Sequence, residues 1–152
     1  MTRKLLFLGC NTDQVPYLEV LQNQDWKIVG SDLNNEAPGK IFCDSFHNIG
    51  YDDFQGLIKL GIKEVFTEND KVFTAAAQFA QKGAAHFSKH FNIPFPSEES
   101  VDTCLDKTRF YESFSKNNIP IPKTWTIRNI DELKCKINES NAEWFYLKSD
   151  FS

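Results

Sequence analysis

The amino-acid sequence predicts an α/β protein with an open parallel sheet that helices cover on both faces. Short apolar runs alternate along the chain with segments in which apolar residues recur every three or four positions. Strands that alternate with helices pair in parallel through right-handed crossovers. The 152 residues, of which 41% are hydrophobic, provide one complete core and too little chain for two full domains.

The first strand is predicted over residues 4–9, an almost unbroken apolar run that ends at a turn. A helix follows, because apolar side chains between residues 15 and 21 recur at helical spacing. The second strand is predicted over residues 27–32, and it ends on a carboxylate. Residues 33–39 consist largely of turn-forming residue types and predict an exposed loop.

A short extended piece with Phe46 turned inward is expected within residues 43–49. The next helix should end at Gly61, since glycine enters the left-handed region without steric cost. Residues 64–67 are apolar enough to predict the third core strand. A long helix is then expected over residues 73–91, where aromatic residues and alanines alternate at spacings of three and four.

The run Pro94-Phe95-Pro96 is expected to end the first domain, because proline neither continues a helix nor fits inside a central strand. Ser97 and Asp106 are suitable caps for two further helices. In the second of these helices, Phe110 and Phe114 pair at a spacing of four.

The last part of the chain predicts a strand, a helix and a second strand. The strands are expected over residues 123–127 and 143–148, which are rich in apolar and aromatic residues. Asn129 and Glu132 form a capping box at the start of the helix that lies between these two strands.

Composition limits the partners of the protein. A net charge of −4 and a pI of about 5.4 give no basic footprint, which disfavours nucleic acid and anionic membranes as partners. No run approaches the roughly 18 apolar residues of a membrane span. The cysteines are widely spaced and predict reduced thiols in a cytoplasmic protein; they are Cys10, Cys43, Cys104 and Cys135.

Asn11, Asp32 and Asn34 follow the first two predicted strands, which places them at the edge of a parallel sheet where ligands bind. The turn at Gly9 lacks the further glycines of a dinucleotide-binding loop, which disfavours NAD. This turn is either an ordinary connection or, because a helix N-terminus attracts negative charge, a site for a small anion or carboxylate. Asp32 either grips a ribose or caps its own turn.

Two other pairs of residues attract attention. His86 and His90 are four apart on a predicted helix, but two ligands without a third do not form a metal site, and we predict no bound metal. Lys107 follows the capping Asp106, and Lys148 ends the last predicted strand. Composition alone favours the interpretation of both as surface lysines.

The order of several short motifs along the whole chain resembles a known family. These motifs are residues 32–39 with Asp44, the junction 94–97, Cys104-Leu105-Asp106-Lys107, residues 119–123 and Phe145-Tyr146-Leu147-Lys148. In this order they resemble the amino-terminal part of an ATP-grasp ligase of the biotin carboxylase, carbamoyl-phosphate synthase and purine-ribonucleotide carboxylase type.

The resemblance implies a division of the chain into three parts. Residues 1–95 would form the Rossmann-like domain that precedes the ATP-grasp proper and often helps to bind the carboxylate substrate. Residues 96–122 would form a helical connector, and residues 123–152 the first part of the nucleotide-binding subdomain. By the same resemblance, Lys107 and Lys148 would contact the phosphates of ATP, a role that suits a flexible ammonium group.

The implied chemistry is phosphorylation of a carboxylate by ATP with Mg²⁺, followed by attack of an amine or other nucleophile. The sequence lacks the glycine-rich loop and the magnesium carboxylates of the family, so we expect it to be a fragment that is not catalytic by itself. The alternative is a stand-alone Rossmann-like module that binds a small ligand or another subunit. Exposed aromatic residues near the end of the chain make oligomerisation possible.

Overall fold

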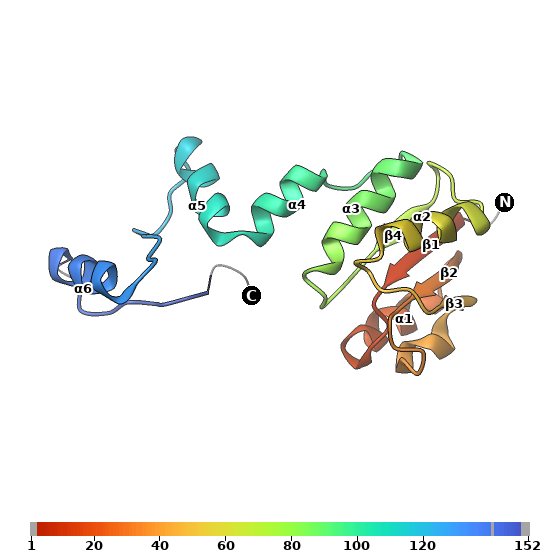
Figure 1. The fold of residues 1–152 in the computed structure, drawn as a ribbon. Coiled ribbons are helices and arrows are strands. Elements are labelled where there is room, and N and C mark those ends of the chain that lie inside the picture. Colours follow the sequence, from red (N-terminus) through yellow and green to blue (C-terminus); the bar gives the residue numbers. More distant parts are fainter. Residues whose placement is uncertain (1–2, 141, 150–152) are drawn as a thin grey trace. The chain divides into compact units, whose positions relative to one another are not determined.

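Figure 1 shows the computed structural model of the chain, which describes residues 3–140 and 142–149. The chain divides into two compact units, Met1–Val101 and Asp102–Ser152. Within the described residues, no helix combines the length and the apolar character that crossing a bilayer requires.

The first unit is built on a four-stranded sheet in the order β3-β2-β1-β4, and every neighbouring pair is parallel. In this register Leu6 of β1 lies between Val29 of β2 and Val72 of β4. The predicted open parallel sheet is therefore confirmed. The strands are β1 (Arg3–Leu8), β2 (Trp26–Ser31), β3 (Ser45–His47) and β4 (Lys71–Phe73).

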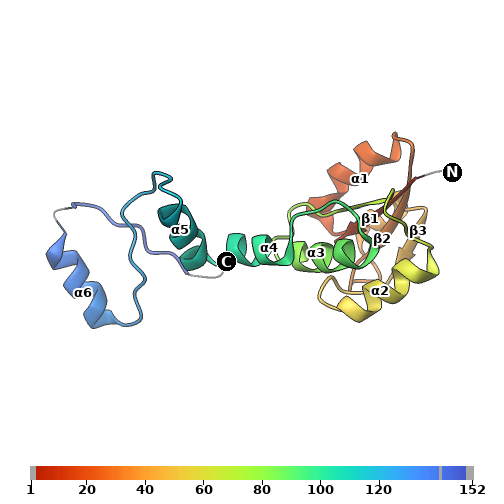
Figure 2. The same ribbon diagram turned by 90° about the horizontal axis from the view of Figure 1, so that it is seen from above.

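Helices cover both faces of this sheet (Figure 2). Leu6 and Leu8 of β1 belong to a buried cluster that includes side chains of α2 and α3. Phe7 points to the opposite face, where it joins a second cluster with Leu18 of α1. The helical elements are α1 (Val15–Gln22), α2 (Phe54–Lys63), α3 (Ala80–Phe91) and the 3₁₀ turns η1 (Thr12–Gln14) and η2 (Pro38–Phe42).

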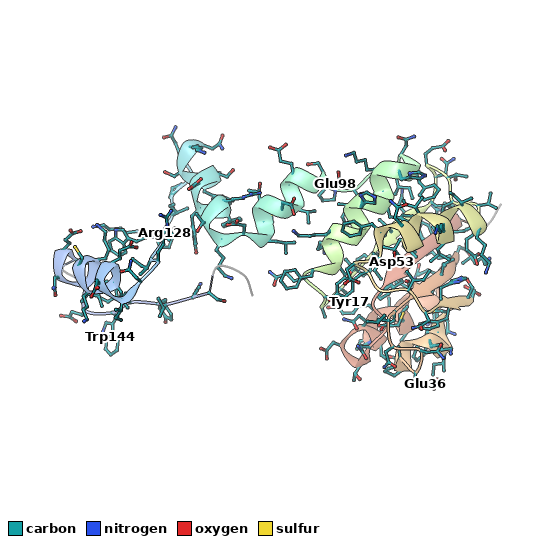
Figure 3. The ribbon with its side chains drawn as sticks, in the orientation of Figure 1. Tyr17, Glu36, Asp53, Glu98, Arg128 and Trp144 are labelled. Atoms are coloured by element: carbon teal, nitrogen blue, oxygen red, sulfur yellow. The ribbon has the colours of Figure 1, made fainter. Side chains whose placement is uncertain are left out.

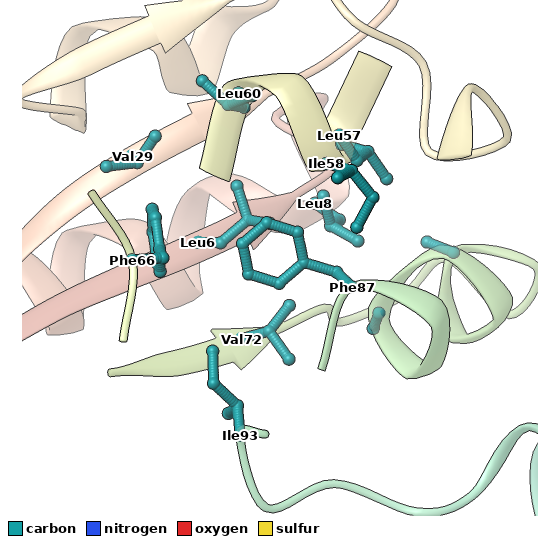
Figure 4. Close-up of a cluster of buried hydrophobic side chains, with 12 residues drawn as sticks. Leu6, Leu8, Val29, Leu57, Ile58, Leu60, Phe66, Val72, Phe87 and Ile93 are labelled. Carbon is teal, nitrogen blue, oxygen red and sulfur yellow. The ribbon is translucent and has the colours of Figure 1, made fainter. Parts of the chain in front are cut away.

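The larger cluster is centred on aromatic rings (Figure 4). Phe87 of α3 is fully buried, and its ring lies 5.1 Å from that of Phe66 in an edge-on arrangement and 4.7 Å from that of Phe91. Burying one such side chain contributes about 1.5–3 kcal/mol. This cluster therefore fixes α2 and α3 on the sheet.

The prediction of a third core strand over residues 64–67 is wrong. Val65 has a φ of 57°, a left-handed conformation that no strand accommodates. The carboxylate of Asp70 then closes a turn by accepting hydrogen bonds from the backbone N–H groups of Thr67 and Lys4 at 2.8 and 2.7 Å. Strand β4 begins only after this turn. Phe66 is nevertheless buried in the core, although it is not part of a strand.

Three further sequence predictions need correction in the first unit. The long helix begins at Ala80 and not at residue 73, because Phe73 belongs to β4. Helix α2 continues through Gly61, where a Cβ would collide with the rings of α3. The loop over residues 33–39 is only partly exposed, because Ala37 and Gly39 are buried. Phe46 packs inward as predicted.

The predicted helix caps are confirmed. Ser97 accepts a hydrogen bond from the N–H of Ser100 at 3.1 Å, and Asp106 accepts one from the N–H of Arg109 at 2.9 Å. Asn129 accepts from two backbone N–H groups at the start of its helix. The helices are α4 (Glu98–Leu105), α5 (Lys107–Lys116) and α6 (Ile130–Glu139).

The predicted strands over residues 123–127 and 143–148 are wrong, since neither segment forms a strand in the described part of the chain. Trp144 is 87% exposed and Tyr146 is 94% exposed, so these rings do not lie in a core (Figure 3). An apolar sequence becomes a strand only when a neighbouring strand completes its hydrogen bonds.

Candidate functional site

The first unit contains a cavity of about 620 Å³ among the loops that follow the strands. Its walls come from four segments, within residues 9–14, 32–34, 50–52 and 76–79. These segments follow β1, β2, β3 and β4 respectively. The cavity therefore lies at the carboxyl edge of the sheet, the place where open α/β folds bind ligands.

The turn after β1 depends on Gly9. Its φ of 89° is a conformation that residues with a Cβ rarely adopt, and its N–H donates to the carbonyl of Ser31 at 2.9 Å. The chain then passes through extended Asn11 into η1. This turn places Asn11 on the cavity wall, together with Asp32 and Asn34.

Asp32 connects the two loops on this side of the cavity. Its Oδ2 accepts a hydrogen bond from the N–H of Cys10 at 2.6 Å, and its Oδ1 accepts one from the N–H of Asn34 at 2.7 Å. The second bond is a cap of its own turn, one of the two roles that the sequence left open. Asp32 thus shapes the cavity besides lining it.

The loop after β2 is held by further amide side chains. Asn34 accepts a hydrogen bond from the N–H of Glu36 at 3.0 Å, and the side chain of Asn48 donates to the carbonyl of Asp32 at 3.0 Å. Short polar side chains that bond to nearby backbone groups stabilise such irregular loops. The cavity wall is therefore preorganised on this side.

The cavity is acidic. Asp13, Asp32 and Asp52 all line it, and none of its lining residues in the described part of the chain is Lys, Arg or His. A concave surface with charges of one sign attracts ligands of the opposite sign. The lining therefore favours a cationic or hydroxyl-rich ligand and disfavours the small anion that a helix N-terminus alone would attract.

Amide and aromatic side chains complete the wall. Gln14 is 4% exposed; its amide nitrogen donates to the carbonyl of Ala75 at 3.0 Å, and its Oε1 has no hydrogen-bond partner among the described residues. Tyr51 and Phe79 are 38% and 43% exposed. Partly exposed rings beside polar groups suit a ligand with both an apolar surface and donor groups.

Sequence reasoning missed the half of the wall formed by residues 50–52 and 76–79. The rule that ligands bind after the strands, applied to β3, would have pointed to Tyr51 and Asp52. The second segment was hidden by the incorrect helix prediction over residues 73–91, which made a loop look like the middle of a helix.

Lys107 and Lys148 both lie in the second unit. Lys107 is the first residue of α5, directly after the capping Asp106, and its side chain is half-buried. Lys148 is exposed and lies in a segment without helix or strand. Neither lysine lines the cavity of the first unit.

Of the two histidines of α3, His86 is half-buried and His90 is exposed. His86 stacks on Phe54, and its Nδ1 lies 2.8 Å from a carboxylate oxygen of Glu98. Hydrogen bonds from Lys89 and then from His86 hold the pKa of Glu98 below its ordinary value. No group of three or more potential metal ligands occurs in the described part of the chain. His86 therefore has a structural partner in Glu98.

Comparison with solved structures shows that the fold is similar to that of the amino-terminal part of ATP-grasp ligases. No protein-family model and no curated protein matches the sequence. The likeness is therefore one of structure, and it establishes the fold.

Solved structures of three proteins illustrate this likeness. Phosphoribosylglycinamide synthetase from Anaerococcus prevotii matches 92% of the chain with a TM-score of 0.68 and 19% identity. N5-carboxyaminoimidazole synthetase from Staphylococcus aureus, complexed with ADP, matches 90% with a TM-score of 0.71 and 15% identity. The biotin carboxylase subunit of pyruvate carboxylase matches 91% with a TM-score of 0.61 and 19% identity. The chain spans 35%, 35% and 33% of these proteins, about one third of each.

Proposed function

We propose that this chain forms the amino-terminal part of an ATP-dependent carboxylate–amine ligase. The observation that carries the proposal is the structural likeness to two such ligases, which extends over nine tenths of the chain. The cavity at the carboxyl ends of the strands supports it, because its volume of about 620 Å³ lies in the range of pockets that bind small molecules.

In the proposed reaction, an oxygen of the carboxylate attacks the γ-phosphorus of ATP and ADP leaves. The amine then attacks the carbonyl carbon of the acyl phosphate, and phosphate leaves. Lys107 and Lys148 are the residues of this chain that we assign to the ATP phosphates, since ammonium groups are suitable partners for phosphate oxygens.

Magnesium supplies charge neutralisation to phosphoryl transfer when it is bound. The described residues contain no cluster of His, Cys, Asp or Glu that fits a metal ion, so we assign no magnesium ligand to this chain.

We assign the amine substrate to the cavity of the first unit, in place of the carboxylate that the family resemblance implied. Asp13 and Asp52 are exposed side chains on its wall, and the lining residues include no cation to balance them. A substrate carboxylate would meet like charge there, whereas an ammonium group would meet opposite charge.

The assignment of the lysines is tested by Mg-ATP binding to the natural full-length protein, measured by calorimetry. Lys107→Ala and Lys148→Ala should each weaken binding about 10- to 100-fold, the usual range for loss of a charged hydrogen-bond partner. Lys116→Ala is the matched control, because Lys116 is also on α5 and its side chain is 77% exposed. Unchanged affinity in both test variants would refute the assignment.

The assignment of the cavity is tested by steady-state kinetics of the same protein. Asp13→Asn and Asp52→Asn should raise KM for the amine about 5- to 50-fold and leave KM for ATP unchanged, because each removes one charge from the wall. Asp25→Asn, at an exposed position outside the cavity, should change neither value. A rise in KM for the carboxylate instead would reverse the assignment.

A second candidate function is a binding module without catalysis. The observation that favours it is that the cavity is formed by the first unit alone. This candidate predicts binding of a small cationic or hydroxyl-rich ligand without any effect of ATP on its affinity. The ligase proposal predicts that the amine binds more tightly when Mg-ATP and the carboxylate are present.

A further inference from the structure

Two cysteines that are distant in sequence meet on the α1 face of the sheet. Cys10 and Cys43 are both free thiols, and both belong to the smaller apolar cluster. Their sulfur atoms each lie within 3.2 Å of the position that a Cβ at Gly30 would occupy. The missing side chain of this glycine in β2 thus provides the space in which the two thiols lie side by side.

Backbone hydrogen bonds hold both cysteines in place. The N–H of Cys10 donates to Asp32 at 2.6 Å, and its carbonyl accepts from the N–H of Gly39 at 2.8 Å. The N–H of Cys43 donates to the carbonyl of Lys40 at 3.2 Å. The next residue, Asp44, bonds to the backbone of β2. The two thiols are therefore brought together by the fold itself.

The surroundings give the two thiols different chemical characters. Cys10 is completely buried, whereas Cys43 is half-buried. The hydrogen bond from the Cys10 thiol to the sulfur of Cys43 lowers the pKa of Cys43, and the same bond together with burial raises the pKa of Cys10. Cys43 is thus the less buried of the two residues, and its lowered pKa favours the thiolate, the form that reacts with oxidants.

We propose that Cys10 and Cys43 form an oxidation site, at which hydrogen peroxide converts the two thiols to an intramolecular disulfide. The Cys43 thiolate attacks one oxygen of the peroxide, the O–O bond breaks, and Cys43 becomes a sulfenic acid while hydroxide leaves. The sulfur of Cys10 then attacks the sulfur of Cys43, and the hydroxyl group leaves as water with the thiol proton of Cys10. Overall, two thiols and one peroxide give one disulfide and two waters.

The test uses the full chain with Cys104→Ser and Cys135→Ser, because these two exposed cysteines would otherwise react independently. After treatment with hydrogen peroxide, alkylation in denaturant and digestion, mass spectrometry should show the peptide of Cys10 joined to that of Cys43. The number of free thiols should fall from two to zero. Recovery of both thiols in alkylated form, or oxidation of Cys43 to sulfinic acid without a cross-link, would overturn the proposal.

Single substitutions in this background separate the roles of the two cysteines. Cys10→Ala should leave Cys43 as a sulfenic acid that dimedone traps, whereas Cys43→Ala should leave Cys10 reduced and at least 10-fold less reactive toward peroxide. Circular dichroism of both variants checks that the fold is retained. Equal reactivity of the two single variants would contradict the assignment of Cys43 as the attacking sulfur.

Discussion

The first unit buries its apolar side chains, whereas the second unit exposes many of its own. Phe7, Phe87 and Leu18 are fully buried in the first unit. Among the described residues of α5 and α6, none is buried. Both units contain segments with apolar residues at helical or strand spacing. The difference in burial therefore comes from whether a neighbouring element packs against these segments.

Strand formation shows this most clearly. The apolar run that becomes β1 lies between β2 and β4 and is paired on both sides. The aromatic run over residues 143–148 has a similar pattern, but it forms no strand and exposes Trp144. Cross-strand pairing, and not the local sequence, is thus what turns an apolar run into a strand.

The largest expected effect of a substitution is in the core of the first unit. Phe87→Ala should lower the free energy of unfolding by about 3–5 kcal/mol, because it leaves a cavity beneath Phe66 and Phe91. Phe110→Ala in α5 should cost less than about 1 kcal/mol, since Phe110 is only half-buried. Urea denaturation measures the free energy of unfolding of both variants. Equal decreases in the two would contradict the difference in packing between the units.

The second prediction concerns close packing between α2 and α3. Gly61→Ala should destabilise the first unit by about 1–3 kcal/mol, because the new Cβ meets the ring of Phe91 and forces it to move. If Gly61 only ended a helix in the left-handed region, as the sequence suggested, Gly61→Asn would be tolerated better than Gly61→Ala, because Asn adopts that conformation more readily. In the packed helix the larger Asn should instead be the more destabilising of the two. Thermal unfolding of both variants distinguishes the two cases.

The third prediction concerns pH. Burial raises the pKa of Glu64, but hydrogen bonds and charges from Lys27 and His47 outweigh it and hold the pKa below its ordinary value of 4.5. The stabilisation that Glu64 gains from these two partners is present above pH 4.5. It is lost as the pH falls through the lower pKa that Glu64 has in the folded state. It should amount to about 1 kcal/mol at most.

Urea denaturation of the wild type and of Glu64→Gln between pH 3 and pH 7 is the measurement for this effect. Glu64→Gln should lower stability at pH 7 and reduce its dependence on pH below 4.5. Glu68→Gln, at an exposed position nearby, should change neither. An unaltered pH profile in Glu64→Gln would contradict the role of this ion pair.

The smallest effect is expected at the exposed aromatic run. Trp144→Ala should change the free energy of unfolding by less than about 0.5 kcal/mol, because the side chain is 87% exposed. A loss of several kcal/mol in urea denaturation would instead support the core strand that the sequence predicted.

The sequence was informative where the signal was local. The caps at Ser97, Asp106 and Asn129 depend on bonds to the next three residues, and all were predicted correctly. The third strand was missed because its start depends on Asp70, whose carboxylate accepts a hydrogen bond from the N–H of Lys4, 66 positions earlier in the sequence. Such long-range bonds leave no pattern in a single sequence.

The candidate site was predictable to a similar extent. Asn11, Asp32 and Asn34 were placed at the strand edge by topology alone, and the structure brings all three to one cavity. The acidic character of that cavity was not predictable, because it arises from Asp13 and Asp52, which come from loops after different strands. The roles of Lys107 and Lys148 remain predictions from the family resemblance.

Oxygen transfer from carboxylate to phosphate tests the proposed ligase function most directly. The natural full-length protein is incubated with Mg-ATP, an amine and a carboxylate labelled with ¹⁸O, and the released phosphate is examined by mass spectrometry. An acyl phosphate intermediate predicts that one ¹⁸O atom from the carboxylate appears in each phosphate released. Release of phosphate without the label, or no ADP formation with any pair of carboxylate and amine, would contradict the proposal.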